Sequence, residues 1–290
     1  MPIAEHLARA GHPITVFDKD PQRLRLAAER GLNLAPDAAS AAASADIVIT
    51  VLPGADEFAD VMLGSVRVVE RMRAGACWLD LTSNDPRVAR RVAAASDERE
   101  VLGVGAPMGG GVESAAHAAL DFYVGGTTAG RVHVSPILEV LARPDGIRFV
   151  GEDVGAGYSA KLLINLLWFG QVAAVTEALL LGQDLGIRPE SLRGLIAGSA
   201  ADSAFAQRHL DRLLEGDYIE TFGLRECVEE LEMVSALASE TRSPFDVSTV
   251  VTRLHRDALQ RFGPVDGEML VAKLLEERHG APLRRSAAPN

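Results

Sequence analysis

The 290-residue sequence predicts an α/β domain with a doubly wound parallel sheet, followed by an all-α domain. Short apolar strands alternate with helical segments up to about Glu152, a rhythm typical of doubly wound sheets. After Gly155 every segment reads as helical, and the apolar stretch from Tyr158 to about Leu185 is long enough to be one joining helix. We expect an α/β domain at 1–153, an all-α domain at 154–280 and a frayed tail at 281–290.

The first half supplies the strands. A helix over Pro2–Ala10 ends at Gly11, a β-branched strand follows at Ile14–Phe17, and the next helix is Pro21–Arg30. Asp46–Leu52 is continuously apolar, as strands buried on both faces of a parallel sheet are. Further strands are predicted at 76–80, 100–104, 121–124 and 147–150. The alternation is that of a Rossmann-type domain.

The second half reads as helices only. They are predicted at 158–185, 189–198, 203–215, 222–241, 244–262 and 266–277. Pro189 and Pro244 lie near two of the helix starts, where proline is favoured.

Composition excludes several classes of protein. The chain is 48% hydrophobic and 24% charged, as globular proteins are, and its net charge of −11 argues against nucleic-acid or anionic-membrane partners. Two cysteines and scattered histidines predict neither a disulfide framework nor a metal site. Gln171 and Glu177 interrupt the long apolar segment, which favours a core helix over a membrane span. With no signal-peptide pattern at the start, we expect a cytoplasmic protein.

Lys161 and Asn165 are the candidate catalytic residues. They are four positions apart on the long helix and therefore lie on one face. A lysine held among apolar neighbours is desolvated and suited to proton exchange near neutrality, and the amide could orient a bound oxygen or the ammonium. The alternative is structural: the lysine extends to water along its stem, and the amide satisfies a backbone group.

The pattern Gly155-x-Gly157-x-x-x-Lys161-x-x-x-Asn165 resembles the interdomain-helix signature of the β-hydroxyacid dehydrogenases, which include 3-hydroxyisobutyrate and 6-phosphogluconate dehydrogenases. The resemblance extends from Pro2 to about Glu277. It implies an NAD(P)-dependent oxidoreductase that transfers hydride between nicotinamide and a small 3-hydroxy carboxylic acid. Lys161 would be the general acid/base, and Asn165 would hydrogen-bond the lysine or the substrate.

Three segments resemble the family's cofactor-binding parts. Asp18 follows the strand Ile14–Phe17, where a carboxylate accepts ribose hydroxyls and repels a 2′-phosphate. NAD is therefore favoured, while Lys19 keeps NADP open and a turn role for Asp18 remains the alternative. The other cofactor-binding candidates are Leu52, Pro53, Thr82 and Ser83, in the loops Thr50–Pro53 and Asp80–Pro86. The second loop could equally be a helix cap before Pro86.

A Rossmann domain ordinarily opens with a strand and Gly-x-Gly-x-x-Gly, whereas this sequence begins inside the first helix. The missing strand is central in the usual order, so we expect the sheet to split. Either the true start lies upstream of Met1, or the chain is truncated and its cofactor binding is impaired.

The segment from Gly105 to Ala115 resembles the family's substrate loop. Gly110 and Gly111 could form a backbone nest for a carboxylate, whereas Gly109 stands where the family has a substrate-binding serine. This departure predicts a substrate other than ordinary 3-hydroxyisobutyrate. Read without the family, the three glycines could equally form a flexible turn.

Glu229 and Glu230 stand where the family has Lys-Asp near the nicotinamide. The reversed charge at Glu229, our last cofactor-binding candidate, could alter cofactor choice, weaken catalysis or mark a dead site; solvated helix faces are the alternative. An imine-reductase-like enzyme and a non-catalytic dimeric scaffold are the rival functions. The apolar length of the long helix predicts a homodimer or a multiple of it.

Overall fold

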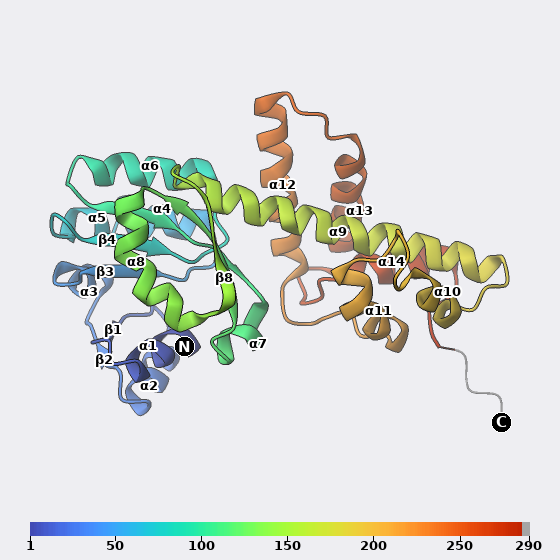
Figure 1. Ribbon diagram of the computed structural model, residues 1–290, viewed down its shortest axis with the longest axis horizontal. Helices are drawn as coiled ribbons and strands as arrows, with labels where there is room; N and C mark the ends of the chain where they lie inside the picture. Colours follow the sequence, from blue (N-terminus) through green and yellow to red (C-terminus); the bar gives the residue numbers. More distant parts are fainter. Residues whose placement is uncertain (286–290) are drawn as a thin grey trace. The chain divides into compact units, whose positions relative to one another are not determined.

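The computed structural model describes residues 1–285, which form two compact units. The first comprises Met1–Lys161, and the second begins at Leu162. The long helix α9 (Gly155–Asp184) starts in the first unit and continues in the second (Figure 1). The predicted α/β part, all-α part and joining helix are confirmed.

The main sheet of the first unit has six strands. They are β3 (Ile47–Thr50), β4 (Cys77–Asp80), β5 (Leu102–Gly105), β6 (Met108–Gly109), β7 (Leu120–Gly126) and β8 (Ala142–Gly151). The order is β3-β4-β5-β7-β6, with β8 also pairing with β7. β3, β4 and β5 are parallel, so the carboxyl ends of β3 and β4 lie at one edge.

The predicted doubly wound sheet is confirmed, but it is mixed rather than wholly parallel. β7 runs antiparallel to both β5 and β6, and β8 is parallel to β7. The reason lies in the connection, since the segment from Gly110 to Ala119 holds only the short helix α7 (Gly111–Ala116). This short connection returns the chain at the end of the sheet where β6 finishes, so β7 runs antiparallel to β6. A parallel pair would need a crossover connection to the opposite end of the sheet.

The expected split of the sheet is observed. β1 (Thr15–Val16) pairs in parallel with β2 (Asn33–Leu34) in a separate two-stranded sheet. The helix α1 (Pro2–Arg9) precedes it in the chain and α2 (Pro21–Glu29) connects its two strands; Asp20 caps α2 by accepting the Gln22 N–H at 2.8 Å.

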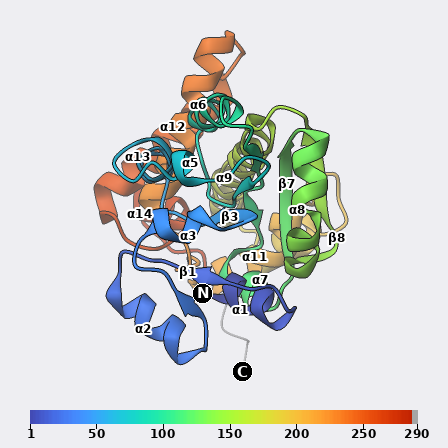
Figure 2. The same ribbon diagram turned by 90° about the vertical axis from the view of Figure 1, so that its left-hand side faces the viewer.

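Helices cover both faces of the main sheet. α8 (Thr128–Leu141) packs on β4, β5, β7 and β8, and Figure 2 shows it beside the last two. The opposite layer consists of α3 (Ala38–Ala43), α4 (Ala55–Leu63), α5 (Val68–Arg71) and α6 (Pro86–Asp97). Its core includes Trp78, whose indole N–H donates to Ser96 Oγ at 2.9 Å. The first unit is thus a three-layer α/β domain.

The first turn of α9 is fixed against the sheet. A Cβ on Gly157 would lie 2.1 Å from the Tyr123 carbonyl oxygen and 2.8 Å from that of Gly105. Two glycines so close together would, from the sequence alone, predict a flexible entry to the helix, whereas Gly157 is tightly packed. Only a residue without a side chain permits this approach of helix to strand.

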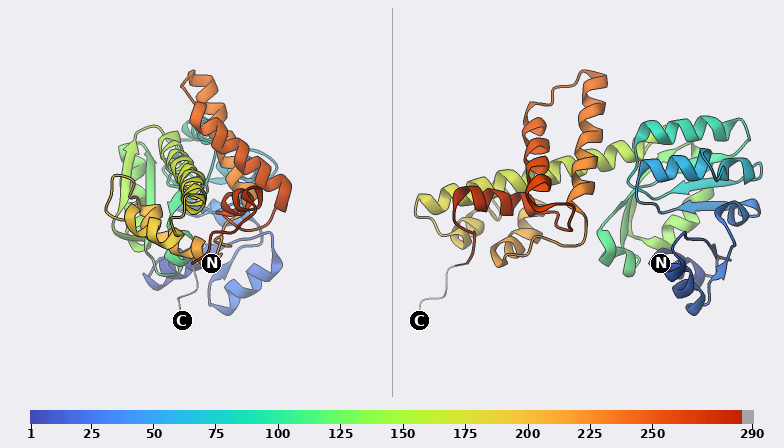
Figure 3. Two further views of the ribbon diagram at one scale, coloured as in Figure 1. Left: turned by 90° about the vertical axis from the view of Figure 1, so that its right-hand side faces the viewer. Right: turned by 180° about the vertical axis from the view of Figure 1, so that it is seen from behind.

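The second unit is helical. Besides most of α9 it contains α10 (Pro189–Ile196), α11 (Ala204–Glu215), α12 (Leu224–Thr241), α13 (Asp246–Phe262) and α14 (Leu270–His279) (Figure 3). Trp168 of α9 lies edge-on to Phe205 of α11, with ring centroids 5.6 Å apart. A second cluster joins Phe169 of α9 to Cys227 of α12 and Val251 of α13. Apolar contacts therefore hold α9 in this unit.

The segment after α14 is described as far as Arg285. Leu283 is fully buried and its N–H donates to Glu276 Oε1 at 2.9 Å, while Arg284 pairs with the same carboxylate at 3.0 Å. Within the expected frayed tail, 281–285 is thus attached to the unit, and 286–290 lie outside the described residues.

Candidate active site

A buried carboxylate, Asp80, organises the carboxyl ends of β3 and β4. Its Oδ1 accepts from Thr50 Oγ1 at 2.7 Å and from the Thr82 N–H at 3.2 Å. Its Oδ2 accepts from Asn84 Nδ2 at 3.0 Å and from the Tyr158 hydroxyl at 2.9 Å. Four donors thus satisfy a carboxylate that has no access to water.

The protonation states in this cluster follow from burial and charge. Burial raises the pKa of Asp80, while the hydrogen bonds from Thr82, Asn84, Thr50 and Tyr158 act in the opposite direction. Burial and then the Asp80 charge raise the pKa of Tyr158 well above its ordinary value. The Tyr158 hydroxyl therefore remains a donor.

The two predicted cofactor loops are joined. The Leu52 N–H donates to Thr82 Oγ1 at 3.0 Å, so this hydroxyl serves the loop itself and Thr82 is buried. Ser83 is half-buried and Pro53 is exposed. The cap of α6 is Asp85, which accepts the Arg87 N–H at 2.8 Å, rather than Thr82 or Ser83.

Asp18 follows β1 in the expected place. Its Oδ1 accepts the Asp20 N–H at 2.9 Å, which is the turn role considered as the alternative. Its Oδ2 lies 3.5 Å from Arg23 Nη1, and 34% of the side chain is exposed. The partly exposed carboxylate of Asp18 thus has Arg23 beside it.

The triple glycine begins at the end of β6. Gly110 has a φ of +104° and Gly111 a φ of +70°, and both residues are exposed. Gly109 is buried, and a Cβ there would lie 3.5 Å from the Tyr123 hydroxyl. The backbone is therefore open to a ligand at Gly110 and Gly111, and a tyrosine hydroxyl lies beside Gly109.

Lys161 and Asn165 are both half-buried on α9. The expected apolar surroundings are only partly present, because Leu163 and Ile164 between them are 53% and 40% exposed. The Asn165 amide Nδ2 donates to Glu230 Oε2 of α12, and the expected contact of Asn165 with the lysine or the substrate stays a prediction. Glu230 is 3% exposed, so a buried carboxylate orients Asn165.

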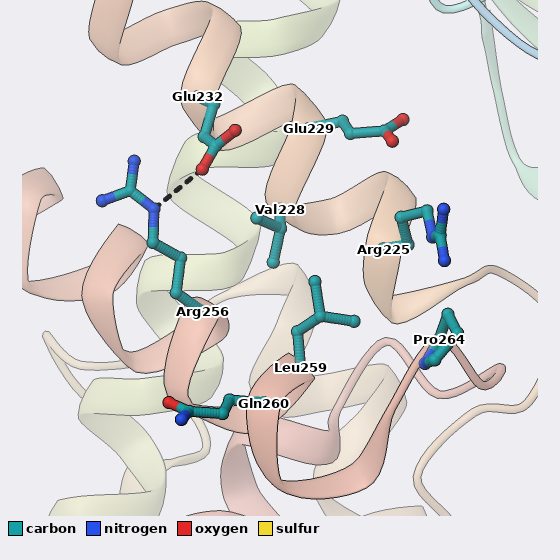
Figure 4. A pocket seen from close by; sticks show the side chains of 8 residues that line it. All are labelled: Arg225, Val228, Glu229, Glu232, Arg256, Leu259, Gln260 and Pro264. Atoms are coloured by element: carbon teal, nitrogen blue, oxygen red, sulfur yellow. Dashed lines mark hydrogen bonds and ion pairs between the residues drawn. The ribbon is translucent and has the colours of Figure 1, made fainter.

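Glu229 is exposed and lines a pocket of ≈ 480 Å³ between α12 and α13. The pocket is lined by Arg225, Val228, Glu229, Glu232, Arg256, Leu259, Gln260 and Pro264 (Figure 4). Arg256 pairs with Glu232 at 2.8 Å, so one cation and one anion of the lining neutralise each other.

Sequence analysis missed the hub of the site. Asp80 ends an apolar strand and Tyr158 lies three residues before Lys161, but 78 positions separate the bonded pair. An acidic residue that ends a fully buried strand was the available signal.

Two further properties bear on partners. Among the described residues, no group of three or more His, Cys, Asp or Glu side chains could hold a metal ion. α9 is long and apolar enough to cross a membrane by length and composition, and 33% of its most apolar window is buried. Core helices of soluble proteins also meet this criterion, so the observation is weak evidence for a membrane.

The sequence matches two family profiles. The NAD-binding domain of 6-phosphogluconate dehydrogenase matches residues 1–153, and a profile described as NAD-binding of NADP-dependent 3-hydroxyisobutyrate dehydrogenase matches residues 155–275. The fold and these matches define an NAD(P)-dependent oxidoreductase. The chain belongs to the β-hydroxyacid dehydrogenase family and is 3-hydroxyisobutyrate dehydrogenase-like.

Individual relatives agree. The 2-(hydroxymethyl)glutarate dehydrogenase of Eubacterium barkeri is 27% identical over 87% of this chain and 83% of its own length. The 3-hydroxyisobutyrate dehydrogenase of Pseudomonas aeruginosa is 32% identical over 69% of this chain and 66% of its own. The solved 3-hydroxyisobutyrate dehydrogenase of Mycobacterium tuberculosis, with L-serine, superposes with a TM-score of 0.85 at 26% identity, covering 94% of each chain.

Proposed function

We propose that the chain oxidises a small 3-hydroxy carboxylic acid or reduces the corresponding oxo acid, with Lys161 as the general acid/base. The observation that carries the proposal is the placement of Lys161 and Asn165 on one face of α9, one turn beyond the docked Gly157. Family membership supports the substrate class.

Each residue would have a defined task. Lys161 Nζ takes the hydroxyl proton during oxidation and returns it to the carbonyl oxygen during reduction. Glu230 accepts a hydrogen bond from the Asn165 amide and so orients this side chain, which would contact the ammonium or the substrate. The N–H groups of Gly110 and Gly111 bind the substrate carboxylate, and the Tyr123 hydroxyl lies beside Gly109, where the family places a serine.

The ribose-binding and strand-end residues present fit a nicotinamide dinucleotide, while the Gly-x-Gly-x-x-Gly turn for its pyrophosphate is not in the given sequence. The half-exposed carboxylate of Asp18 suits ribose hydroxyls, and the loops with Leu52, Pro53 and Ser83 follow the carboxyl ends of β3 and β4, where such folds bind nucleotides. The nicotinamide ring supplies hydride exchange with the carbinol carbon. Glu229 stays a cofactor-binding candidate through its correspondence to the family's lysine.

We propose NAD as the preferred cofactor, because the Asp18 carboxylate would repel a 2′-phosphate. Arg23, 3.5 Å from that carboxylate, opposes the preference together with Lys19. We also propose a homodimer: Leu163 and Leu167 of α9 are 53% and 66% exposed, and Leu181 and Leu185 are 59% and 70% exposed. The cytoplasm is the proposed location.

The test combines binding with turnover. NADH and NADPH are titrated calorimetrically into the parent protein and into Lys161→Ala, and both proteins are assayed with a panel of 3-hydroxy acids. We expect Lys161→Ala to lower kcat at least about a thousandfold and to change the NADH Kd less than about threefold. Near-normal turnover by Lys161→Ala would remove this lysine from the mechanism, and tighter binding of NADPH would overturn the NAD preference.

A further inference from the structure

One hydrogen bond ties a strand end to the helix of the proposed catalytic lysine. The Tyr158 hydroxyl, in the first turn of α9, donates to Asp80 Oδ2 at 2.9 Å. Both side chains are fully buried, so water cannot replace either partner. A charge-assisted hydrogen bond in such surroundings is among the stronger ones that proteins make.

The packing around Tyr158 leaves its ring little freedom to move. A Cβ on Gly105 of β5 would lie 2.3 Å from the ring of Tyr158, so the ring lies directly on the backbone of that strand. The same buried cluster contains Trp78 and Val154. Packing therefore fixes the position of the Tyr158 ring, and the hydrogen bond fixes the position of its hydroxyl group.

Tyr158 and Lys161 are three residues apart on the same helix. Side chains at this spacing are neighbours on one side of a helix, so the rotation that fixes Tyr158 also fixes the direction in which Lys161 leaves the backbone. The close approach of Gly157 to the backbone of Tyr123 and Gly105 fixes the distance between the same turn and the sheet.

Asp80 also holds the cofactor loops. Its Oδ1 accepts from Thr50, which precedes Leu52, and from the Thr82 N–H, while Thr82 Oγ1 accepts from the Leu52 N–H. One carboxylate therefore fixes both loops and the first turn of α9.

We propose that Tyr158 and Asp80 are a positioning pair, which holds Lys161 in register with the loops that receive the cofactor. The inference rests on the proposed function of Lys161. Neither residue is assigned contact with substrate or nicotinamide; they act through the turn and the loops. Displacing a catalytic group by a fraction of an ångström is enough to lower kcat.

The test is Tyr158→Phe, which keeps the packed ring and removes the donor. We expect kcat to fall roughly ten- to hundredfold, with KM for the cofactor within about threefold of the parent value. The pH profile of kcat should differ from that of the parent, whereas a general loss of stability would leave the profile unchanged. Hydrogen exchange of residues 155–165 should accelerate roughly tenfold in the cofactor-free protein.

The matched control is Ser96→Ala. It removes another buried side-chain partner in the same unit, the acceptor of the Trp78 indole, and Ser96 touches neither α9 nor the loops by hydrogen bond. This variant should lower Tm while kcat, its pH profile and exchange at 155–165 stay within twofold or about 0.2 pH units of the parent. An equal loss of kcat in Ser96→Ala would overturn the proposal, because general softening would then explain both variants.

Asp80→Asn provides a second line if Tyr158→Phe does not fold. Its amide nitrogen would face two of the four groups that donate to Asp80, so we expect a loss of kcat at least as large as that of Tyr158→Phe, and faster exchange at both 50–53 and 155–165. Unchanged kcat and exchange in a folded variant would overturn the pair. If the parent turns over no 3-hydroxy acid, the proposed function fails, and exchange at 155–165 still decides whether Tyr158 anchors the turn.

Discussion

The two ends of α9 are held by different physical means. In the first unit a close backbone approach at Gly157 and the hydrogen bond from Tyr158 to Asp80 fix its first turn. In the second unit the helix is held on one side by apolar residues such as Phe169 and Leu179, while Leu167 is 66% exposed. The first attachment is specific in geometry and the second depends on buried area.

The difference bears on where function tolerates change. A backbone approach that leaves no room for a Cβ accepts no added atom, whereas an apolar face accepts repacking of similar volume. Lys161 lies one turn after the rigid attachment at Gly157, whereas the exposed leucines lie on the part of α9 that apolar packing holds. Three experiments sharpen this contrast.

The largest expected effect is that of Gly157→Ala. The added methyl would meet backbone atoms of Tyr123 at 2.1 Å and Gly105 at 2.8 Å, neither of which can rotate away. We expect the free energy of unfolding of the first unit to fall by about 3 kcal/mol or more in urea. Gly155→Ala is the control, because its methyl meets the side chains of Arg90 and Asp153, and its effect should stay within about 1 kcal/mol.

A pH-dependent effect is expected in the second unit. Burial lowers the pKa of His255 to about 4, and its ring lies 5.1 Å from that of Phe169 on α9. Between that value and about 6.5 the unfolded chain binds the proton more tightly, so stability falls as pH falls through this window, by about 3 kcal/mol at most.

His255→Gln isolates this contribution. The variant is less stable near neutrality, but its unfolding free energy should fall less steeply than that of the parent between pH 6.5 and pH 4. Parallel urea-derived curves for the two proteins would show that the histidine does not titrate in this window.

The smallest effect on folding is expected at the exposed face of α9. Leu167→Glu should change the unfolding free energy of the subunit by less than about 0.5 kcal/mol, yet weaken the proposed homodimer in sedimentation equilibrium. Val132→Glu, on α8, is matched in exposure at 67% and should leave the association unchanged. A monomeric parent protein, or equal association of all three, would contradict the proposed dimer face.

Much of the fold was predictable because it depends on the local periodicity of hydrophobic residues. The apolar run at 46–52 and the glycine and proline stops indicated the parallel strands and the helices, and the separation of β1 and β2 from the main sheet was also expected. The reversed direction of β7 was not predictable, since it depends on how the chain between Gly110 and Ala119 returns. β8 was predicted as 147–150, but pairing with β7 recruits Ala142–Gly146, whose composition is that of a turn.

The site was predictable where residues act through spacing along one helix, as Lys161 and Asn165 do. It was not predictable where partners meet across the fold. Glu230 as the partner of Asn165, and Asp80 as the partner of Tyr158, need tertiary contacts 65 and 78 residues apart.

The chain's two tryptophans divide between the units. Trp78 is fully buried in the first unit against Ser96, and Trp168 packs against Phe205 in the second. Each indole can therefore serve as an intrinsic fluorophore for the unit that contains it. Emission from variants that retain one tryptophan would record whether the α/β unit and the helical unit lose their structure together or in succession.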